Sequence, residues 1–155
     1  MDQILDTVQV EKAQLKYAGF GDRLVALIID SILLWIVNAI ISAAFIGIAM
    51  VTSQALTTES VGSLVLMYIV IVGINYLYFA LMESSERMAT IGKRAMGLKV
   101  CDMNGERISF GRATGRYFAK IISGIILGIG YLMVIWSDKK QGLHDQIAGT
   151  LVTKK

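Results

Sequence analysis

The chain has few charged residues, one cysteine and one histidine. Its 155 residues include 17% charged side chains, fewer than a soluble domain carries, and the mean hydropathy is +0.61. Cys101 has no second cysteine with which to form an internal disulfide, which suits a reducing compartment. His144 is the only histidine, so no combination of Cys and His has the spacing of a zinc site. We therefore expect neither an enzyme nor a resident cofactor or metal.

The apolar residues come in long blocks. Residues 24–51 contain one charged residue, Asp30, and residues 61–82 contain none. A run of about 18 or more apolar residues predicts a membrane-spanning helix. We therefore expect a mainly α-helical integral membrane protein, a single domain over residues 1–155, with spans at 24–51 and 61–82.

The distribution of Lys and Arg predicts the orientation of these spans, because both are concentrated in cytoplasmic loops. Residues 83–120 contain eight of the 15 Lys and Arg residues, whereas the 52–60 loop contains none. Residues 1–20 lack an apolar core with a cleavage site, so we expect the first span to be retained as an anchor. The N-terminal segment, residues 1–22, is then cytoplasmic. We interpret the basic residues as topology signals facing anionic lipid, and expect no nucleic-acid partner.

The third apolar segment, residues 114–136, has two interpretations. A full third span would place the four lysines of the 137–155 tail outside, against the charge rule. A helix break near Gly128 and Gly130 would instead give a re-entrant hairpin that returns the tail to the cytoplasm, provided that other protein covers the break. In the plain-span alternative, Gly124 and Gly128 form a GxxxG helix contact.

Residues 88–113, which connect the second and third blocks, predict an amphipathic stretch followed by a β-hairpin. The basic residues 88–98 would lie along the membrane surface, with Thr90 as the helix cap. Asn104 and Gly105 predict a two-residue turn in which both residues have positive φ.

The end of the chain predicts a further strand. Residues 149–155 are rich in β-forming side chains and would pair with the hairpin if the tail is cytoplasmic. A third strand would stabilise a hairpin that is marginal alone in water.

Polar residues within the apolar blocks form the candidate site. Arg23 and Asp30 are separated by about two helical turns and lie on nearly one line of the first span. The adjoining face is also polar, so this wedge is expected to face protein or water rather than lipid. The candidate ion or proton site comprises Asp30, Ser31, Asn38, Ser42 and, in the second span, Asn75.

Arg23 has a better predicted partner than Asp30. Asp30 lies about 10 Å deeper, and a helical side chain leans toward its amino-terminal end, so Arg23 would have to reach the wrong way. We therefore predict that Arg23 pairs with Asp145 of the GLHDQIAGT segment. His144 is interpreted as a hydrogen-bonded structural neighbour of Asp145, and Glu83 is expected to pair with Arg87 or Lys93.

These features resemble a known family. Arg23 and Asp30 in the first block, followed by TIGKRAMGLKV, NGERISFGRA and GLHDQIAGT, resemble the RDD family of small membrane proteins. The family is named for one arginine and two aspartates, which match Arg23, Asp30 and Asp145 here. The resemblance implies the membrane of a cell, most simply the bacterial inner membrane. It also implies transport in some members, which look like Na⁺(Li⁺)/H⁺ antiporters.

Two functions follow as hypotheses. In the first, Asp30 takes up a proton or a cation such as Na⁺ or Li⁺ in an oligomeric transporter, and is kept for that role rather than for stability. One chain is too small to enclose a pathway, so the site would lie near the axis of a homo-oligomer. In the alternative, the Arg–Asp–Asp set is structural, and the protein is a membrane assembly or accessory protein whose cytoplasmic face binds a partner.

Overall fold

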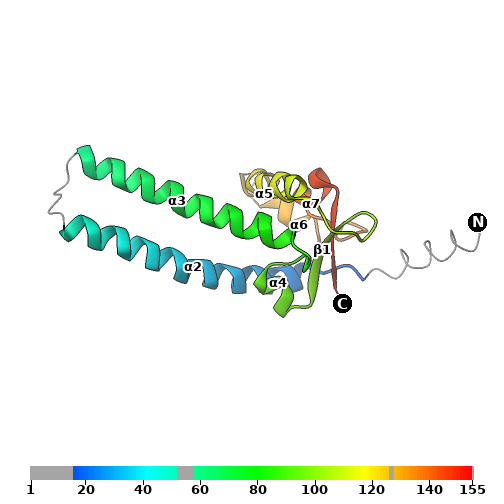
Figure 1. Cartoon of the computed structure of the whole chain (residues 1–155). Coiled ribbons are helices and arrows are strands. Elements are labelled where there is room, and N and C mark those ends of the chain that lie inside the picture. The colour runs from blue at the N-terminus through cyan, green and yellow to red at the C-terminus, as the bar shows by residue number, and fades with distance from the viewer. Residues whose placement is uncertain (1–15, 52–57, 126–127, 155) are drawn as a thin grey trace, which may run out of the picture.

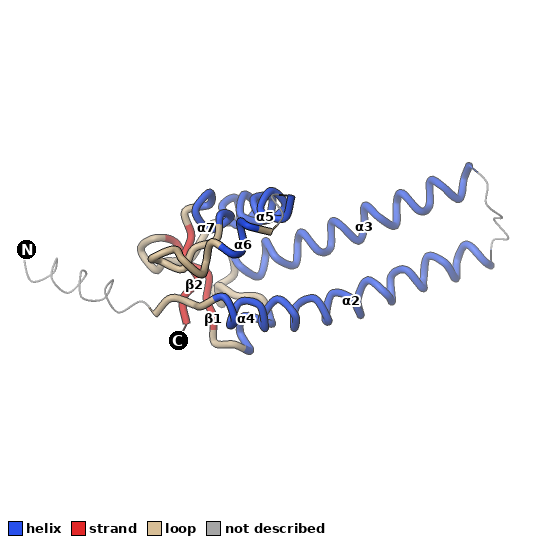
Figure 2. Tube along the Cα trace, turned by 180° about the vertical axis from the view of Figure 1, so that it is seen from behind, coloured by secondary structure: helices blue, strands red, loops and turns tan. Residues whose placement is uncertain are grey.

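A long helical hairpin leaves a compact end in which the other elements gather. The computed structural model describes residues 16–51, 58–125 and 128–154. Helix α2 (Phe20–Val51) and helix α3 (Thr58–Glu83) run antiparallel and project together from the end that holds all shorter elements (Figure 1; Figure 2). Within them, Phe20–Ile48 and Val61–Glu83 are long and apolar enough to cross a membrane. They coincide with the spans expected at 24–51 and 61–82.

The surface of this hairpin is apolar. In the most apolar 18-residue stretch of each helix, only 17% of the residues of α2 and 6% of those of α3 are buried. Large side chains such as Trp35, Ile40 and Leu66 lie on the outside. A soluble helix would bury its apolar stripe and expose polar groups on the other side. This hairpin therefore suits surroundings that are themselves apolar.

Helix α4 (Ile91–Ala95) packs directly against α2. Thr90 caps it, as expected, by accepting a hydrogen bond from the backbone nitrogen of Lys93 at 3.4 Å. Gly92 allows the close approach, since a Cβ there would overlap the carbonyl oxygen of Ala26 and lie 2.9 Å from Cγ of Asp30. Gly92 and Lys93 are buried, so this part of the 88–98 stretch does not lie free along a surface.

A two-stranded antiparallel sheet joins the middle of the chain to its end. Strand β1 (Leu98–Asp102) pairs with strand β2 (Thr150–Lys154), with Val100 opposite Val152. The strand expected at 149–155 is therefore present. Backbone bonds also attach the segment before α2, because Ala18 donates to Val152 at 2.9 Å and Lys154 donates to Lys16 at 2.8 Å.

The predicted β-hairpin is reduced to a turn and one bridge. Cys101 of β1 forms an isolated antiparallel bridge with Arg107. Gly105 has a φ of +87°, but Asn104 is not among the residues with positive φ, so the expected turn with two such positions is wrong. Gly105 donates to the carbonyl of Asp102 at 3.2 Å, which is the closing bond of a turn centred on Met103 and Asn104. The regular partner of β1 is therefore β2, and Cys101 pairs with Leu151 of β2 as well as with Arg107.

The third apolar segment does not form one continuous helix. Helix α5 (Phe110–Ile125) is followed by Gly128, with φ of +73°, and the short helix α6 (Ile129–Leu132). α6 packs closely on α5 at Gly130, where a Cβ would lie 2.8 Å from the Cβ of Ser123. The spaces at Gly124 and Gly128 are open, so among the described residues they do not form the GxxxG contact of the plain-span alternative.

The chain then returns to the sheet through helix α7 (Leu143–Ala148). β2 lies beside β1 at the compact end of the molecule, near the C-terminal end of α3 (Figure 1). Among the described residues, the test for a spanning helix is met by α2 and α3 and not by the 114–136 segment.

Candidate functional site

A row of buried charges joins the C-terminal end of α3 to α4, α5 and α7. Glu83, the last residue of α3, accepts from Lys93 at 2.5 Å, from Arg116 at 2.7 Å and from Lys120 at 3.1 Å. The expected pairing of Glu83 with Lys93 is therefore present, and two cations of α5 join it. Glu83 and Arg116 are each 1% exposed, so neither charge is solvated by water. In a buried pair of this kind, removal of one partner is costly because the other is left uncompensated.

Asp145 continues the row on the other side of Arg116. Its Oδ1 accepts from Nη2 of Arg116 at 2.5 Å, and its Oδ2 accepts from Nη1 of Arg23. The expected pairing of Arg23 with Asp145 is thus present. Arg23 also donates to the backbone carbonyls of Ala18 and Lys140, at 3.2 and 2.6 Å. One guanidinium therefore fastens the beginning of α2 to the chain around α7.

The electrostatics of this row keep Asp145 and Arg116 charged. Burial acts to raise the pKa of Asp145, but the charges of Arg116 and Arg23 outweigh it and hold that pKa well below its usual range. Burial likewise acts to lower the pKa of Arg116, and the carboxylates of Glu83 and Asp145 outweigh it and raise that pKa. Both residues therefore remain ionised over a wide pH range.

Asp30 lies apart from the row and holds α4. It is 2% exposed and accepts three hydrogen bonds. The donors are the hydroxyl of Tyr78 at 2.6 Å, the hydroxyl of Thr90 at 2.6 Å and the backbone nitrogen of Gly92 at 2.8 Å. Tyr78 also accepts from the backbone nitrogen of Ile91 at 3.1 Å, so Asp30 and Tyr78 together bind the start of α4 to both long helices.

This geometry gives Asp30 a structural role, which the transport hypothesis denied it. Ser31 is exposed and so faces away from the α2–α3 interface. Asn38 and Ser42 are eight and twelve residues further along α2, which places them about 12 and 18 Å deeper. Asn75 donates to Asn38 at 3.2 Å and to the carbonyl of Ile71 at 2.7 Å. Asn38 and Asn75 are thus brought together, but not onto Asp30.

Five residues that sequence reasoning did not assign to the site carry much of it. They are Tyr78, Glu83, Thr90, Arg116 and Lys120. One signal for Arg116 was available. Ala113, Arg116, Ala119 and Ser123 share one helical face, so Arg116 stands within a row of small residues that is buried in the structure. A charge inside such a row needs a carboxylate partner, and Glu83 is the acid at the inner end of the second apolar block.

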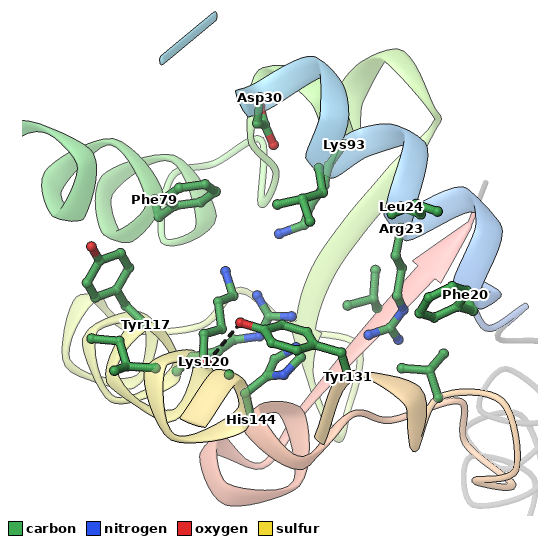
Figure 3. Close-up of a pocket in the computed structure, with 16 residues that line it drawn as sticks. Phe20, Arg23, Leu24, Asp30, Phe79, Lys93, Tyr117, Lys120, Tyr131 and His144 are labelled. Atoms are coloured by element: carbon green, nitrogen blue, oxygen red, sulfur yellow. Dashed lines mark hydrogen bonds between the residues drawn. The ribbon is translucent and has the colours of Figure 1, made fainter. Parts of the chain in front are cut away.

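A cavity of about 530 Å³ lies beside the row. Its walls come from α2 to α7 and from β2, and most lining residues are apolar, with four cations among them. Figure 3 shows Lys93 and Lys120 directing their amines into this space from opposite sides, with Asp30 and His144 at its two ends. The cations are Arg23, Lys93, Arg116 and Lys120.

His144 is held neutral at one end of the cavity. Burial lowers the pKa of His144 to about 3, with Arg116 and other cations opposing the pull of Asp145. Its ring lies 5.1 Å from that of Tyr131, centroid to centroid. Among the described residues its Nδ1 is the buried side-chain nitrogen or oxygen without a hydrogen-bond partner. His144 lies beside Asp145, as expected, with its Nε2 3.5 Å from Oδ1 of Asp145, but its Nδ1 is left unpaired.

The site contains no arrangement typical of a metal centre. Within the described ranges, no group of three or more His, Cys, Asp and Glu side chains could hold a metal ion. The two carboxylates of the row are already occupied by arginines and lysines.

Fold and site together define a class of protein: two apolar helices of spanning length, fastened at one end by an arginine and two aspartates. The model of the RDD family matches residues 17–149, and the chain belongs to this family. Over 151 residues it is 41% identical to "Uncharacterized protein YxaI" of Bacillus subtilis, covering 90% of this chain and 99% of that protein.

Other relatives match with lower identity. "Uncharacterized membrane protein YteJ" of Bacillus subtilis is 35% identical over 144 residues, which are 88% of this chain and 80% of that protein. A "Proline-rich antigen" of Mycobacterium leprae is 36% identical over 64 residues, which are 41% of this chain and 26% of that protein. No solved structure matches the chain.

Proposed function

We propose that this chain is a multi-pass protein of the bacterial cell membrane, with α2 and α3 as its spans and its compact end in the cytoplasm. The length and hydropathy of both helices support this placement, and so does the similarity to YteJ, which is named as a membrane protein. The excess of Lys and Arg in residues 83–120 supports a cytoplasmic compact end, because these residues are concentrated in cytoplasmic loops.

Its function in this proposal is that of a membrane assembly or accessory protein. The observation that carries the proposal is that all three family-naming residues are engaged within the chain. Arg23 binds Asp145, and Asp30 accepts three hydrogen bonds from neutral groups of α3 and the start of α4. These residues build a rigid base under two helices whose lateral surfaces remain open, and such surfaces suit contact with a second copy or with another membrane protein.

The mass of the purified complex tests this function. The full chain, extracted in a mild detergent after lipid-permeable cross-linking of intact membranes, should have a mass above that of one chain plus its micelle. Trp35→Ala, which alters an exposed position of α2, should reduce that mass or the cross-linking yield, whereas Met103→Ala at the compact end should not. A single-chain mass in every condition would contradict the proposal.

Cation or proton transport remains the second candidate, supported by one observation. Asp30 is a buried carboxylate inside an apolar helix, and the Asn38–Asn75 pair follows deeper along the same interface. Proteoliposomes tested under Na⁺, Li⁺, K⁺ and pH gradients would reveal such an activity. Flux that Asp30→Asn abolishes, in a variant that keeps its fold and mass, would favour transport over the accessory role.

A further inference from the structure

The cavity beside the charge row contains more positive charge than its own carboxylates balance. Four cationic side chains line it, and the carboxylates of Glu83 and Asp145 pair with them. Asp30 can offset one further charge, although its hydrogen-bond donors are neutral groups. While Lys93 is protonated, one positive charge is thus left over in a space with few polar walls, where an anion would be strongly attracted.

The rest of the cavity is apolar and open at the side. Leu24 and Leu27 of α2 and Ile121 of α5 line it, and each of these side chains is also exposed. Their exposure links the cavity to the apolar outer face of the hairpin. An occupant could therefore keep its charged part at the lysines and extend an apolar part along α2 and α5.

One atom of the cavity lining has an unused hydrogen-bonding capacity. Nδ1 of His144 is buried without a partner, although a polar atom in that position costs free energy unless it is paired. His144 lines the cavity together with Tyr131 and Lys120. This nitrogen is itself buried, so a headgroup hydroxyl would reach it only if the His144 ring turned toward the cavity.

We propose that the cavity is a binding site for one anionic phospholipid. Its phosphate accepts from the amines of Lys93 and Lys120 beside the Glu83 carboxylate that both amines already bind, and an acyl chain lies against Leu24, Leu27 and Ile121. The apolar walls favour a lipid over a free phosphate, which could use the cations but would leave the walls facing water or an empty space. This inference depends on the membrane placement proposed above, and not on the accessory or transport role.

Lipid binding by the full chain tests the proposal. The protein would be reconstituted with phosphatidylglycerol or phosphatidylcholine, extracted gently, and examined by native mass spectrometry for retained lipid. We expect one phosphatidylglycerol per chain to persist at detergent concentrations that remove phosphatidylcholine. Lys120→Gln should weaken this retention about five-fold, as expected for the loss of one cation near a lipid headgroup. Arg112→Gln is the matched control, since Arg112 is on the same helix but outside the cavity.

A second variant fills the cavity without removing any charge. Gly124 lines the cavity and a Cβ there meets nothing within 4 Å, so Gly124→Leu should block the acyl chain while every ion pair stays in place. Gly115→Leu on the same helix also enters open space but lies outside the lining, and should leave retention unchanged. Gly124→Leu therefore decides the question even if Lys120→Gln folds poorly.

The possible outcomes separate the inference from its alternatives. Equal retention of both lipids, or retention that Gly124→Leu does not reduce, would overturn it. Displacement of phosphatidylglycerol by millimolar inorganic phosphate would mean that the site takes the free anion instead. If the protein is recovered without membranes at all, the membrane placement itself has failed, which is a different result from loss of lipid selectivity.

Discussion

Arg23, near the beginning of α2, donates to the carboxylate of Asp145 in α7, 122 residues further along the chain. The same carboxylate binds Arg116, and Arg116 in turn binds Glu83. Four side chains from four helices thus alternate in charge through the base of the molecule. Because the partners are buried, each charge depends on its neighbours for the solvation that water would otherwise provide.

Breaking the Arg23–Asp145 pair should be costly and non-additive. Arg23→Ala and Asp145→Ala should each reduce the free energy of unfolding, or the folded yield, by an amount of the order of 3–5 kcal/mol that is typical of a broken buried pair. The double variant should lose less than the sum of both, because the Arg23–Asp145 interaction can be lost only once.

An exposed pair provides the control for this cycle. Lys154 and Asp22 are joined at 2.7 Å, but their side chains are 35% and 26% exposed. Their coupling should stay under about 1 kcal/mol. Strictly additive losses for Arg23 and Asp145 would show that they do not interact in the folded protein.

Gly92→Ala should loosen α4. The added Cβ would overlap the carbonyl oxygen of Ala26 and crowd Asp30, so α4 would have to shift from α2. We expect a loss of about 1–3 kcal/mol of stability and faster proteolysis within residues 88–97. Gly73→Ala, where a Cβ meets nothing within 4 Å, should be neutral or slightly stabilising. Equal behaviour of both variants would contradict the close packing of α4 on α2.

Acidification should destabilise the protein through His144. Because burial lowers the folded-state pKa of His144 to about 3 from 6.5, its contribution to stability is fully present above pH 6.5. It is lost as the pH falls from 6.5 toward 3, since the unfolded chain binds the proton more readily. Thermal unfolding in detergent between pH 7 and pH 4.5 should therefore show a falling midpoint, and His144→Phe should flatten that dependence.

Lys93 acts in a separate pH window. Burial lowers its pKa to about 7 from 10.5, against the pull of Glu83, so its contribution to stability decreases as the pH falls from 10.5 to 7. If the unfolding midpoint of His144→Phe still falls below pH 6.5 as steeply as that of the unsubstituted chain, a group other than His144 is responsible.

The carboxyl terminus should be cytoplasmic. β2 pairs with β1, so the tail ends on the same side as the Lys- and Arg-rich connection after α3. With Cys101 replaced by Ala, a cysteine substituted for Lys155 should resist an impermeant thiol reagent in intact cells and react after permeabilisation. Labelling in intact cells would place the tail outside and restore a third span.

Much of this protein is determined by its sequence alone. The apolar blocks predict α2 and α3 because only helices of that length and composition satisfy their backbone groups in an apolar medium. The TIGKR, NGERISFGRA and GLHDQIAGT segments identify the family, and the stretched Arg23–Asp30 distance along one helix directs Arg23 to Asp145. Thr90 as a cap and 149–155 as a strand follow from local preferences.

The tertiary structure decided which polar groups meet. A helical wheel places Asp30, Asn38 and Ser42 on adjoining faces, but it does not show that α4 approaches Asp30 and supplies its hydrogen bonds. Similarly, Asn104 and Gly105 favour a local hairpin, but β2 supplies the regular pairing. Its Leu151 lies 50 residues beyond Cys101, so local preferences around the turn do not reveal this partner. Local patterns fix periodicity and direction within one element. The partners of a buried charge depend on contacts between elements that are distant in the sequence, and the Glu83–Arg116–Asp145 row is built entirely from such contacts.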